Sequence, residues 1–283
     1  MRLSDAPESG NFHDRTGGGG MSLGGGGLGL ILSLVASRFG IVGVLILGLG
    51  YCALSSLGGG GLLGGGGGEG GGTKSTLTAD QRTLLAGTLG STEQVWGQIF
   101  QQAGATYRPT ELIAYSNMGQ SGCGAAQAAM GPFYCPTDSS IYIDPTFFDE
   151  LSRRFGAPGD AAQAYVIAHE VGHHVQNLEG TLERAQSAQG SLGQAQGNAI
   201  QVGIELQADC YAGVWAARSG LLEAGDIQEG MRAAEAIGDD TLQKQSQGRV
   251  VPESFTHGSS AQRQEALQRG LQSGNPAACN YTG

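Results

Sequence analysis

The segment VIAHEVGHHV, residues 166–175, holds two histidines four positions apart and a glutamate directly after the first. An α-helix turns by about 100° per residue, so His169 and His173 would lie on one face and could bind one metal ion together. Glu170 would be offset by about 100°, within reach of a water molecule on that ion. This His-Glu-x-x-His pattern is typical of zinc peptidases. The alternative is a pair of histidines packed in a core, because the flanking residues are mostly apolar.

A catalytic zinc site usually has three protein ligands and one open position, and the sequence offers a third ligand downstream. In GIELQADCYAGVWAA, Glu205 and Asp209 are again four residues apart among apolar neighbours. Two carboxylates in such surroundings need partners, because burying an unpaired charge is costly. We therefore expect Glu205 to be the third zinc ligand. We expect Asp209 to accept a hydrogen bond from the non-ligating nitrogen of one of the two histidines.

Two other nearby side chains fit the third-ligand role less well. The extended metzincin pattern would place a glycine at position 176 and a histidine at position 179, where this chain has Gln176 and Glu179. Glu179 is therefore expected at the surface near a helix end. His174 is offset by about 100° from His173, which favours a packing or supporting role.

Two further residues could stabilise the negative charge that develops on a carbonyl oxygen during peptide hydrolysis. His257 stands in VVPESFTHGSSAQR and Tyr142 stands in SSIYID. To act in this way, either side chain must lie opposite the base Glu170. The simpler interpretations are a loop histidine near a helix N-terminus and a tyrosine that packs in a strand.

Several motifs, in the same order along the chain, resemble those of the bacterial neutral zinc metallopeptidases. They are GPFYCPTDSSIYID, AYVIAHEVGHHVQN, ELQADCYAGVWA and AIGDDTLQKQSQGRVVPESFTHGSSAQR. The resemblance covers residues 76–283 and implies a zinc peptidase with a membrane anchor after a glycine-rich tail. HExxH followed by ExxAD also resembles the gluzincin-type membrane metalloproteases, whose glutamate matching Glu205 binds zinc. THGSSAQR is similar to their T-H-P…R stretch, with Gly258 replacing the proline, which implies a role for His257.

Charge and glycine content divide the chain into two parts. Of the 52 glycines, 26 lie in the first 72 residues. Residues 1–75 carry four basic and four acidic side chains, whereas residues 76–283 carry 11 and 21, so the net charge of -10 lies in the second part. An acidic domain repels phosphate backbones, so we expect no nucleic-acid partner.

The first part has the pattern of a membrane anchor. FGIVGVLILGLGYCALSSL, residues 39–57, has no charge over 19 residues and nearly matches a hydrocarbon core of about 30 Å. Three arginines precede it and only Lys74 follows closely, which predicts a cytoplasmic N-terminus. A cleaved signal peptide is the alternative, but its n-region of about 38 residues would be too long.

These features predict a single-pass protein of the bacterial inner (cytoplasmic) membrane with its catalytic domain on the extracytoplasmic side. The predicted parts are a disordered glycine-rich cytoplasmic tail at 1–27, an anchor at 28–57, a glycine-rich linker at 58–75 and a metallopeptidase domain at 76–283.

The second part is expected to be mostly helical. LTADQRTLLAGTLGSTEQVWGQIFQQAG is typical of helix, with Thr78 and Ser91 as candidate N-caps. PTFFDELSRRFG predicts a helix with Pro145 in its first turn and Gly156 past its end, and Asp160 could cap the helix that carries the histidines. ELIAYSN and SSIYID predict strands. Further helices are expected near 196–219, 223–237 and 259–272. The predicted fold is α+β: a mostly helical, zincin-like (gluzincin-type) domain with a small β-sheet, preceded by one transmembrane helix.

Four of the five cysteines lie in the domain that we place in an oxidising compartment, and they allow three pairings. We prefer Cys123–Cys135, which closes a local loop, and Cys210–Cys279, which fixes the C-terminus to the helix of Glu205. Free buried thiols would be favoured in a cytosolic domain. A second zinc site is disfavoured because the chain has no C-x-x-C spacing.

Together these patterns predict a membrane-anchored zinc endopeptidase that acts on a peptide or protein. Zn²⁺ held by the two histidines and Glu205 would activate a water, and Glu170 would transfer its proton to the departing amine. The substrate could add as a strand along residues 139–143. The alternative is a zinc-stabilised, non-catalytic binding or assembly protein of the cell envelope. Glu170 argues against it, because structural zinc needs no base beside its ligands.

Overall fold

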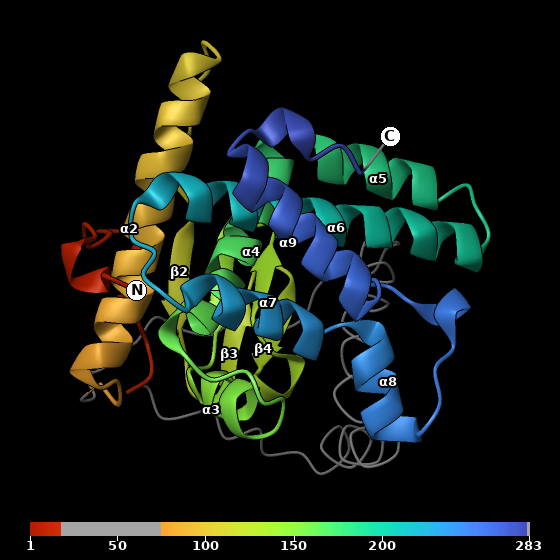
Figure 1. Ribbon diagram of the computed structural model, residues 1–283, viewed down its shortest axis with the longest axis horizontal. Coiled ribbons are helices and arrows are strands. Elements are labelled where there is room, and N and C mark those ends of the chain that lie inside the picture. The colour runs from red at the N-terminus through yellow and green to blue at the C-terminus, as the bar shows by residue number, and fades with distance from the viewer. Residues whose placement is uncertain (18–74, 282–283) are drawn as a thin grey trace, which may run out of the picture.

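The computed structural model describes residues 1–17 and 75–281 and shows an α+β fold that is mostly helical (Figure 1). This confirms the α+β class of the prediction, mostly helical with a small sheet. No helix within these two ranges is long and apolar enough to cross a membrane. The predicted anchor at 28–57 and all but the last residue of the predicted linker at 58–75 lie outside the described residues.

The described strands form a four-stranded sheet and a separate two-stranded hairpin. They are β1 (Phe12–Asp14), β2 (Glu111–Ala114), β3 (Met118–Ser121), β4 (Gly124–Gln127), β5 (Phe133–Cys135) and β6 (Ser140–Ile143). The sheet has the order β1-β2-β6-β5, in which β1, β2 and β6 are parallel and β5 is antiparallel to β6. The two strands predicted from ELIAYSN and SSIYID are confirmed as β2 and β6.

Helices α4 and α2 contact the sheet, α6 packs on α4, and α6 and α9 lie side by side (Figure 1). The bounds of the helices are α2 (Ala79–Gln102), α3 (Thr146–Arg153), α4 (Asp160–Leu178), α5 (Thr181–Gln189), α6 (Gln194–Ser219), α7 (Asp226–Ala236), α8 (Asp239–Gln247) and α9 (Ser260–Ser273). Short 3₁₀ segments lie at Leu3–Asp5, Ala128–Met130, Pro252–Ser254 and Pro276–Ala278. The helices predicted near 196–219, 223–237 and 259–272 are confirmed as α6, α7 and α9.

The predicted helix caps are confirmed in part. Thr78 caps α2 through a capping box with Gln81, as expected. Ser91 caps nothing, because α2 is one continuous helix, and its buried hydroxyl accepts a hydrogen bond from Trp215. Asp160 is the first residue of α4 rather than its N-cap, which is the preceding glycine.

Alternation along the strands decides which side chains face α4. In β2 and β6, Leu112 and Ile141 belong to the main core, which includes the buried face of α4. Ile113 and Tyr142 project to the opposite face of the sheet, into a smaller core. Successive side chains in a strand point to opposite faces, so Tyr142 and α4 lie on different sides of the sheet.

Glycines allow the site-bearing helices to approach at backbone distance. At Gly172 of α4, a Cβ atom would lie 2.9 Å from the Cα and the carbonyl oxygen of Ala208 on α6. At Gly270 of α9, a Cβ atom would lie 1.9 Å from the carbonyl oxygen of Cys210, also on α6. Unstrained non-bonded carbon contacts are about 3.5–4.0 Å. Only glycine therefore fits at either crossing, and α6 is held tightly against both partners.

Residues 1–17 are folded against the rest of the chain, so the prediction of a disordered tail is wrong for this stretch. β1 pairs with β2 in register, and the side chain of Leu3 is buried in the main core. The composition of the segment did not predict this packing, because the residues that the segment contacts lie far along the sequence. Residues 18–27 of the predicted tail lie outside the described residues.

Both preferred disulfides are present. Cys123 is bonded to Cys135, and Cys210 is bonded to Cys279. The second bond joins α6 to the C-terminal segment, as predicted, directly beside the residues that build the site.

Candidate metal centre

The three predicted ligands meet where α4 packs on α6. Nε2 of His169 lies 3.2 Å from Oε2 of Glu205, and Nε2 of His173 lies 3.6 Å from the same oxygen. In a tetrahedral zinc site with ligand bonds of 2.0–2.2 Å, neighbouring ligand atoms are about 3.3–3.6 Å apart. The distance from His173 falls in this range and the distance from His169 is just below it, so both are close to the edges of a tetrahedral site.

Asp209 holds His169 from the side away from Glu205. Its Oδ1 accepts hydrogen bonds from Nδ1 of His169 at 2.8 Å and from the Tyr165 hydroxyl at 2.6 Å. Burial raises the pKa of Asp209, but Arg263 and His169 outweigh it and lower the pKa to about 2. Because the carboxylate is ionised, Nδ1 of His169 carries the proton and Nε2 is left as a free donor atom for a metal. This is the position predicted for Asp209.

Arg263 of α9 is the third partner of the Asp209 carboxylate, after His169 and Tyr165. Its Nε and Nη2 donate to the two carboxylate oxygens of Asp209 at 2.8 and 2.9 Å. Both side chains are buried, and Asp209 has no exposed surface. Sequence reasoning included Arg263 only as the last residue of THGSSAQR and gave it no role.

Gln176 holds the second histidine. Its Oε1 accepts from Nδ1 of His173 at 2.9 Å, while its Nε2 donates to the Ile204 carbonyl and to Oε1 of Gln207. The two donations fix the orientation of the amide, so His173 must be the donor in the remaining bond. Gln207 in turn donates to the carbonyl of Cys279 at 3.0 Å. Sequence reasoning noted Gln176 only as a departure from metzincins, since a neutral amide gives no charge or motif signal.

Glu170 is buried beside the ligands. Burial raises its pKa, although the two neighbouring histidines offset part of that rise. The backbone N–H of Tyr134 on β5 also interacts with this carboxylate. A carboxylate with a raised pKa at such a position can act as a general base near neutral pH.

His257 lies in the loop before α9, close enough to Glu205 for that carboxylate to affect its pKa. Burial lowers the pKa of His257, but Asp239 and Glu205 outweigh it and raise the value. Oδ1 of Asp239 lies 3.2 Å from Nδ1 of His257, and Oδ2 accepts the backbone N–H groups of residues 256–258. Asp239, the first residue of α8, therefore fixes both the loop and the ring. Sequence reasoning missed it, because nothing near Asp239 in the chain indicates His257 as its partner.

Residues 1–282 match the family described as "Putative neutral zinc metallopeptidase". The chain belongs to this family. The protein YpfJ of Escherichia coli strain K12 is 45% identical over 294 residues, which cover 100% of this chain and 99% of YpfJ. The protein Rv2575 of Mycobacterium tuberculosis strain H37Rv is 42% identical over 211 residues, 69% of each chain. No solved structure matches.

The donor set fits the zinc ion that this family's name implies. Glu170 and Glu205 are only 7% and 6% exposed, and no lysine or arginine of the described ranges forms an ion pair with either carboxylate. The nearby charge of Arg263 is matched by Asp209. Neighbouring histidines interact with these two buried carboxylates, and a divalent cation bound between the imidazoles and Glu205 would neutralise buried negative charge that is otherwise costly. Two imidazoles and a carboxylate are the ligands of many catalytic zinc sites.

Tyr142 does not join this group, contrary to the predicted catalytic role. It projects to the sheet face away from α4, and its hydroxyl donates to Asp138 at 2.7 Å. The strand alternation that buries Ile141 and Ile143 toward α4 turns Tyr142 away from the site.

Two residues that were weighed as ligands have other partners. Glu179 follows α4 and accepts a hydrogen bond from the Tyr211 hydroxyl at 2.8 Å. His174 is buried between the Tyr134 hydroxyl, at 3.1 Å from Nδ1, and the Arg108 carbonyl, at 2.6 Å from Nε2. The packing role favoured for His174 is therefore confirmed.

Proposed function

We propose that this protein is a zinc-dependent peptidase with a zincin-like, gluzincin-type site. His169, His173 and Glu205 would hold the ion. The observation that carries the proposal is the tetrahedral spacing of their ligand atoms beside the buried Glu170. When bound in such a site, zinc acts as a Lewis acid that polarises a carbonyl group and lowers the pKa of water to about 7.

The chain's own groups then divide the work of hydrolysis. Glu170 takes the proton from the attacking water and delivers it to the departing amine, a task that its raised pKa favours. His257, held by Asp239, donates a hydrogen bond to the carbonyl oxygen as negative charge develops on it. Asp209 and Gln176 keep the two ligand imidazoles in fixed orientation.

The substrate strand is better placed on β5 than on residues 139–143. β6 is paired on one side with β2 and on the other with β5, so it has no free edge for a peptide. β5 is the outer strand of the described sheet on that side. The N–H of Tyr134 faces Glu170, so a peptide paired with the outer edge of β5 would pass the catalytic carboxylate.

We further propose that the protein is attached to the cytoplasmic membrane and that its domain faces an extracytoplasmic compartment. The charge-free stretch at 39–57 supports the membrane attachment. Two disulfides support the location, because such bonds persist in oxidising compartments.

The decisive experiment separates zinc binding from turnover. Wild-type protein and Glu170→Gln should each bind about one zinc per chain, whereas only the wild type should cleave a peptide library analysed by mass spectrometry. Glu205→Ala should lose zinc, and Glu179→Ala, a nearby carboxylate outside the site, is the matched control that should retain it. Cleavage by Glu170→Gln would exclude Glu170 as the base. A zinc-loaded wild type without any cleavage would favour the non-catalytic envelope protein.

A further inference from the structure

The N-terminal segment, residues 1–17, contacts the domain at several points between Met1 and Thr16. In register, Phe12 of β1 lies opposite Leu112 of β2, and Asp14 lies opposite Ala114. Ahead of this strand, Ser9 and Asn11 both donate to the carboxylate of Glu93 on α2, at 2.6 and 2.8 Å. The segment therefore bonds both to the sheet and to α2.

The sequence of α2 accommodates this segment. At Gly90, a Cβ atom would lie 1.9 Å from the carbonyl oxygen of Pro7, and at Gly87 it would lie 3.3 Å from that of Leu3. Glycine is a poor helix former, so two glycines one turn apart need a reason. Here the backbone of the N-terminal segment occupies the space that side chains would take.

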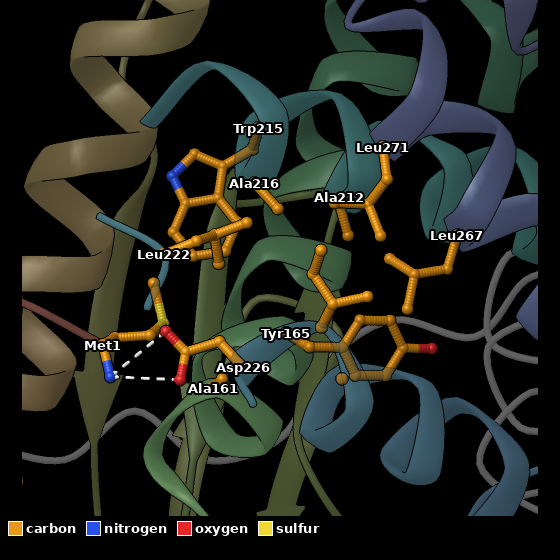
Figure 2. A pocket seen from close by; sticks show the side chains of 12 residues that line it. Met1, Ala161, Tyr165, Ala212, Trp215, Ala216, Leu222, Asp226, Leu267 and Leu271 are labelled. Atoms are coloured by element: carbon orange, nitrogen blue, oxygen red, sulfur yellow. Dashed lines mark hydrogen bonds and ion pairs between the residues drawn. The ribbon is translucent and has the colours of Figure 1, made fainter. Parts of the chain in front are cut away.

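The beginning of the segment reaches the helical core (Figure 2). The Met1 side chain lines a small cavity of about 20 Å³ together with Trp215 and Leu222. Its amino group lies 3.3 Å from Asp226. Contacts thus extend from the sheet edge to the helices that carry the metal centre.

The residues on either side of the undescribed stretch touch one another. The backbone N–H of Thr76 donates to Oγ1 of Thr16 at 3.1 Å. The carboxylate of Asp14 accepts from the hydroxyl of Ser75 and from Arg82. The described residues on the two sides of the stretch 18–74 therefore meet at one place on the folded domain, and the apolar stretch 39–57 lies between them in the sequence.

We propose that residues 1–17 and the domain lie on the same side of the membrane, and that the surface where Thr16 meets Ser75 and Thr76 faces the lipid bilayer. A hydrocarbon core is about 30 Å thick, so a single crossing would separate groups that are in hydrogen-bond contact. This replaces the single-pass arrangement predicted from the arginines. The backbone N–H groups of Arg2 and Arg15 donate to the carbonyls of Leu221 and Ala114 within the domain. These two arginines therefore lie on the same side of the membrane as the domain. The proposal uses the membrane attachment proposed above and is independent of zinc chemistry.

Cysteine labelling of the full chain in membranes tests the topology. In a Cys52→Ser background, Ser4→Cys and Ser187→Cys place single thiols at exposed sites of the N-terminal segment and of the domain, since the other four cysteines are disulfide-bonded. A membrane-impermeant maleimide is added to spheroplasts or to inverted vesicles. Both thiols should react in spheroplasts. If both react only in inverted vesicles, the two sites still lie on one side of the membrane, which also supports the proposal. Reaction from opposite sides would overturn the proposal, and so would recovery of the full chain in the soluble fraction.

A second measurement tests the docking itself. Gly90→Ala should release the N-terminal segment and accelerate tryptic cleavage after Arg15 by about tenfold or more, because local opening controls such cleavage. Gly97→Ala on the same helix is the matched control, since a Cβ atom there would meet nothing within 4 Å. Zinc content should stay unchanged in both variants, which separates local release from unfolding. Equal cleavage rates in the two variants would overturn the docking.

Discussion

Replacing Asp209 with asparagine should affect both the stability of the fold and the metal centre. The carboxylate accepts from His169, from Tyr165 and twice from Arg263, all in the core. Leaving Arg263 buried without its counter-charge costs about 3–5 kcal/mol of unfolding free energy. Removing the acceptor that orients His169 should weaken zinc binding by about 10–100-fold. Since domains are typically stable by about 5–15 kcal/mol, the variant should still fold.

The double variant Asp209→Asn/Arg263→Met separates the two effects. Thermal and denaturant unfolding are measured in excess chelator, so that bound zinc adds nothing to stability. The second substitution removes the buried charge, so it should restore part of the lost unfolding free energy. It should not restore zinc affinity, measured by chelator competition, because His169 still lacks its carboxylate. Additive stability losses, or wild-type zinc affinity in Asp209→Asn, would refute the assigned role.

Other predictions concern the remaining supports of the site. Gln176→Leu removes the acceptor of His173 and should weaken zinc binding by about 10–100-fold in chelator competition; wild-type affinity would show that the amide is dispensable. Replacing Cys210 and Cys279 by serine opens a loop with a sequence separation of 69 and should cost about 4 kcal/mol in denaturant unfolding, because the unfolded chain gains conformational freedom. Gly172→Ala should lower zinc affinity despite the better helix propensity of alanine, because α4 and α6 must separate; unchanged affinity would contradict the tight crossing.

The candidate metal-site residues could be predicted from the sequence because they form two pairs, each within one helix. The spacing of His169 and His173, and of Glu205 and Asp209, fixes the relative direction of the side chains as soon as the segment is helical. The apolar neighbours then indicated that both helices are buried. Which helices cross, and at what distance, depends on backbone contacts such as that at Gly172, which periodicity does not reveal.

The missed residues act through partners that are distant or neutral. Gln176 carries no charge, and its bonds to Ile204 and Gln207 join two different helices. Asp239 starts a short helix that periodicity did not predict. Tyr142 was considered without knowing which face of the strand α4 would cover, so its direction could not be derived from the sequence.

The N-terminal segment shows how composition can mislead. A short stretch before glycine tracts has the composition of a tail, and a three-residue strand gives almost no alternation to detect. The detectable sign lay elsewhere, in Gly87 and Gly90 of a helix that is otherwise well formed. These two glycines leave room for another backbone on their face of the helix, although they do not identify it.

The C-terminal segment supports the candidate metal centre. Cys210 directly follows Asp209 and is bonded to Cys279, whose carbonyl accepts from Gln207. Gln207 in turn accepts from Gln176, the residue that orients His173. The segment at 276–279 thus supports one ligand through an amide chain and anchors the helix of Glu205 through a covalent bond. A truncation that spares every ligand but removes this segment would leave the buried amide of Gln207 without its acceptor, at about 1–3 kcal/mol. The metal centre therefore depends on residues almost to the last one that the structure describes.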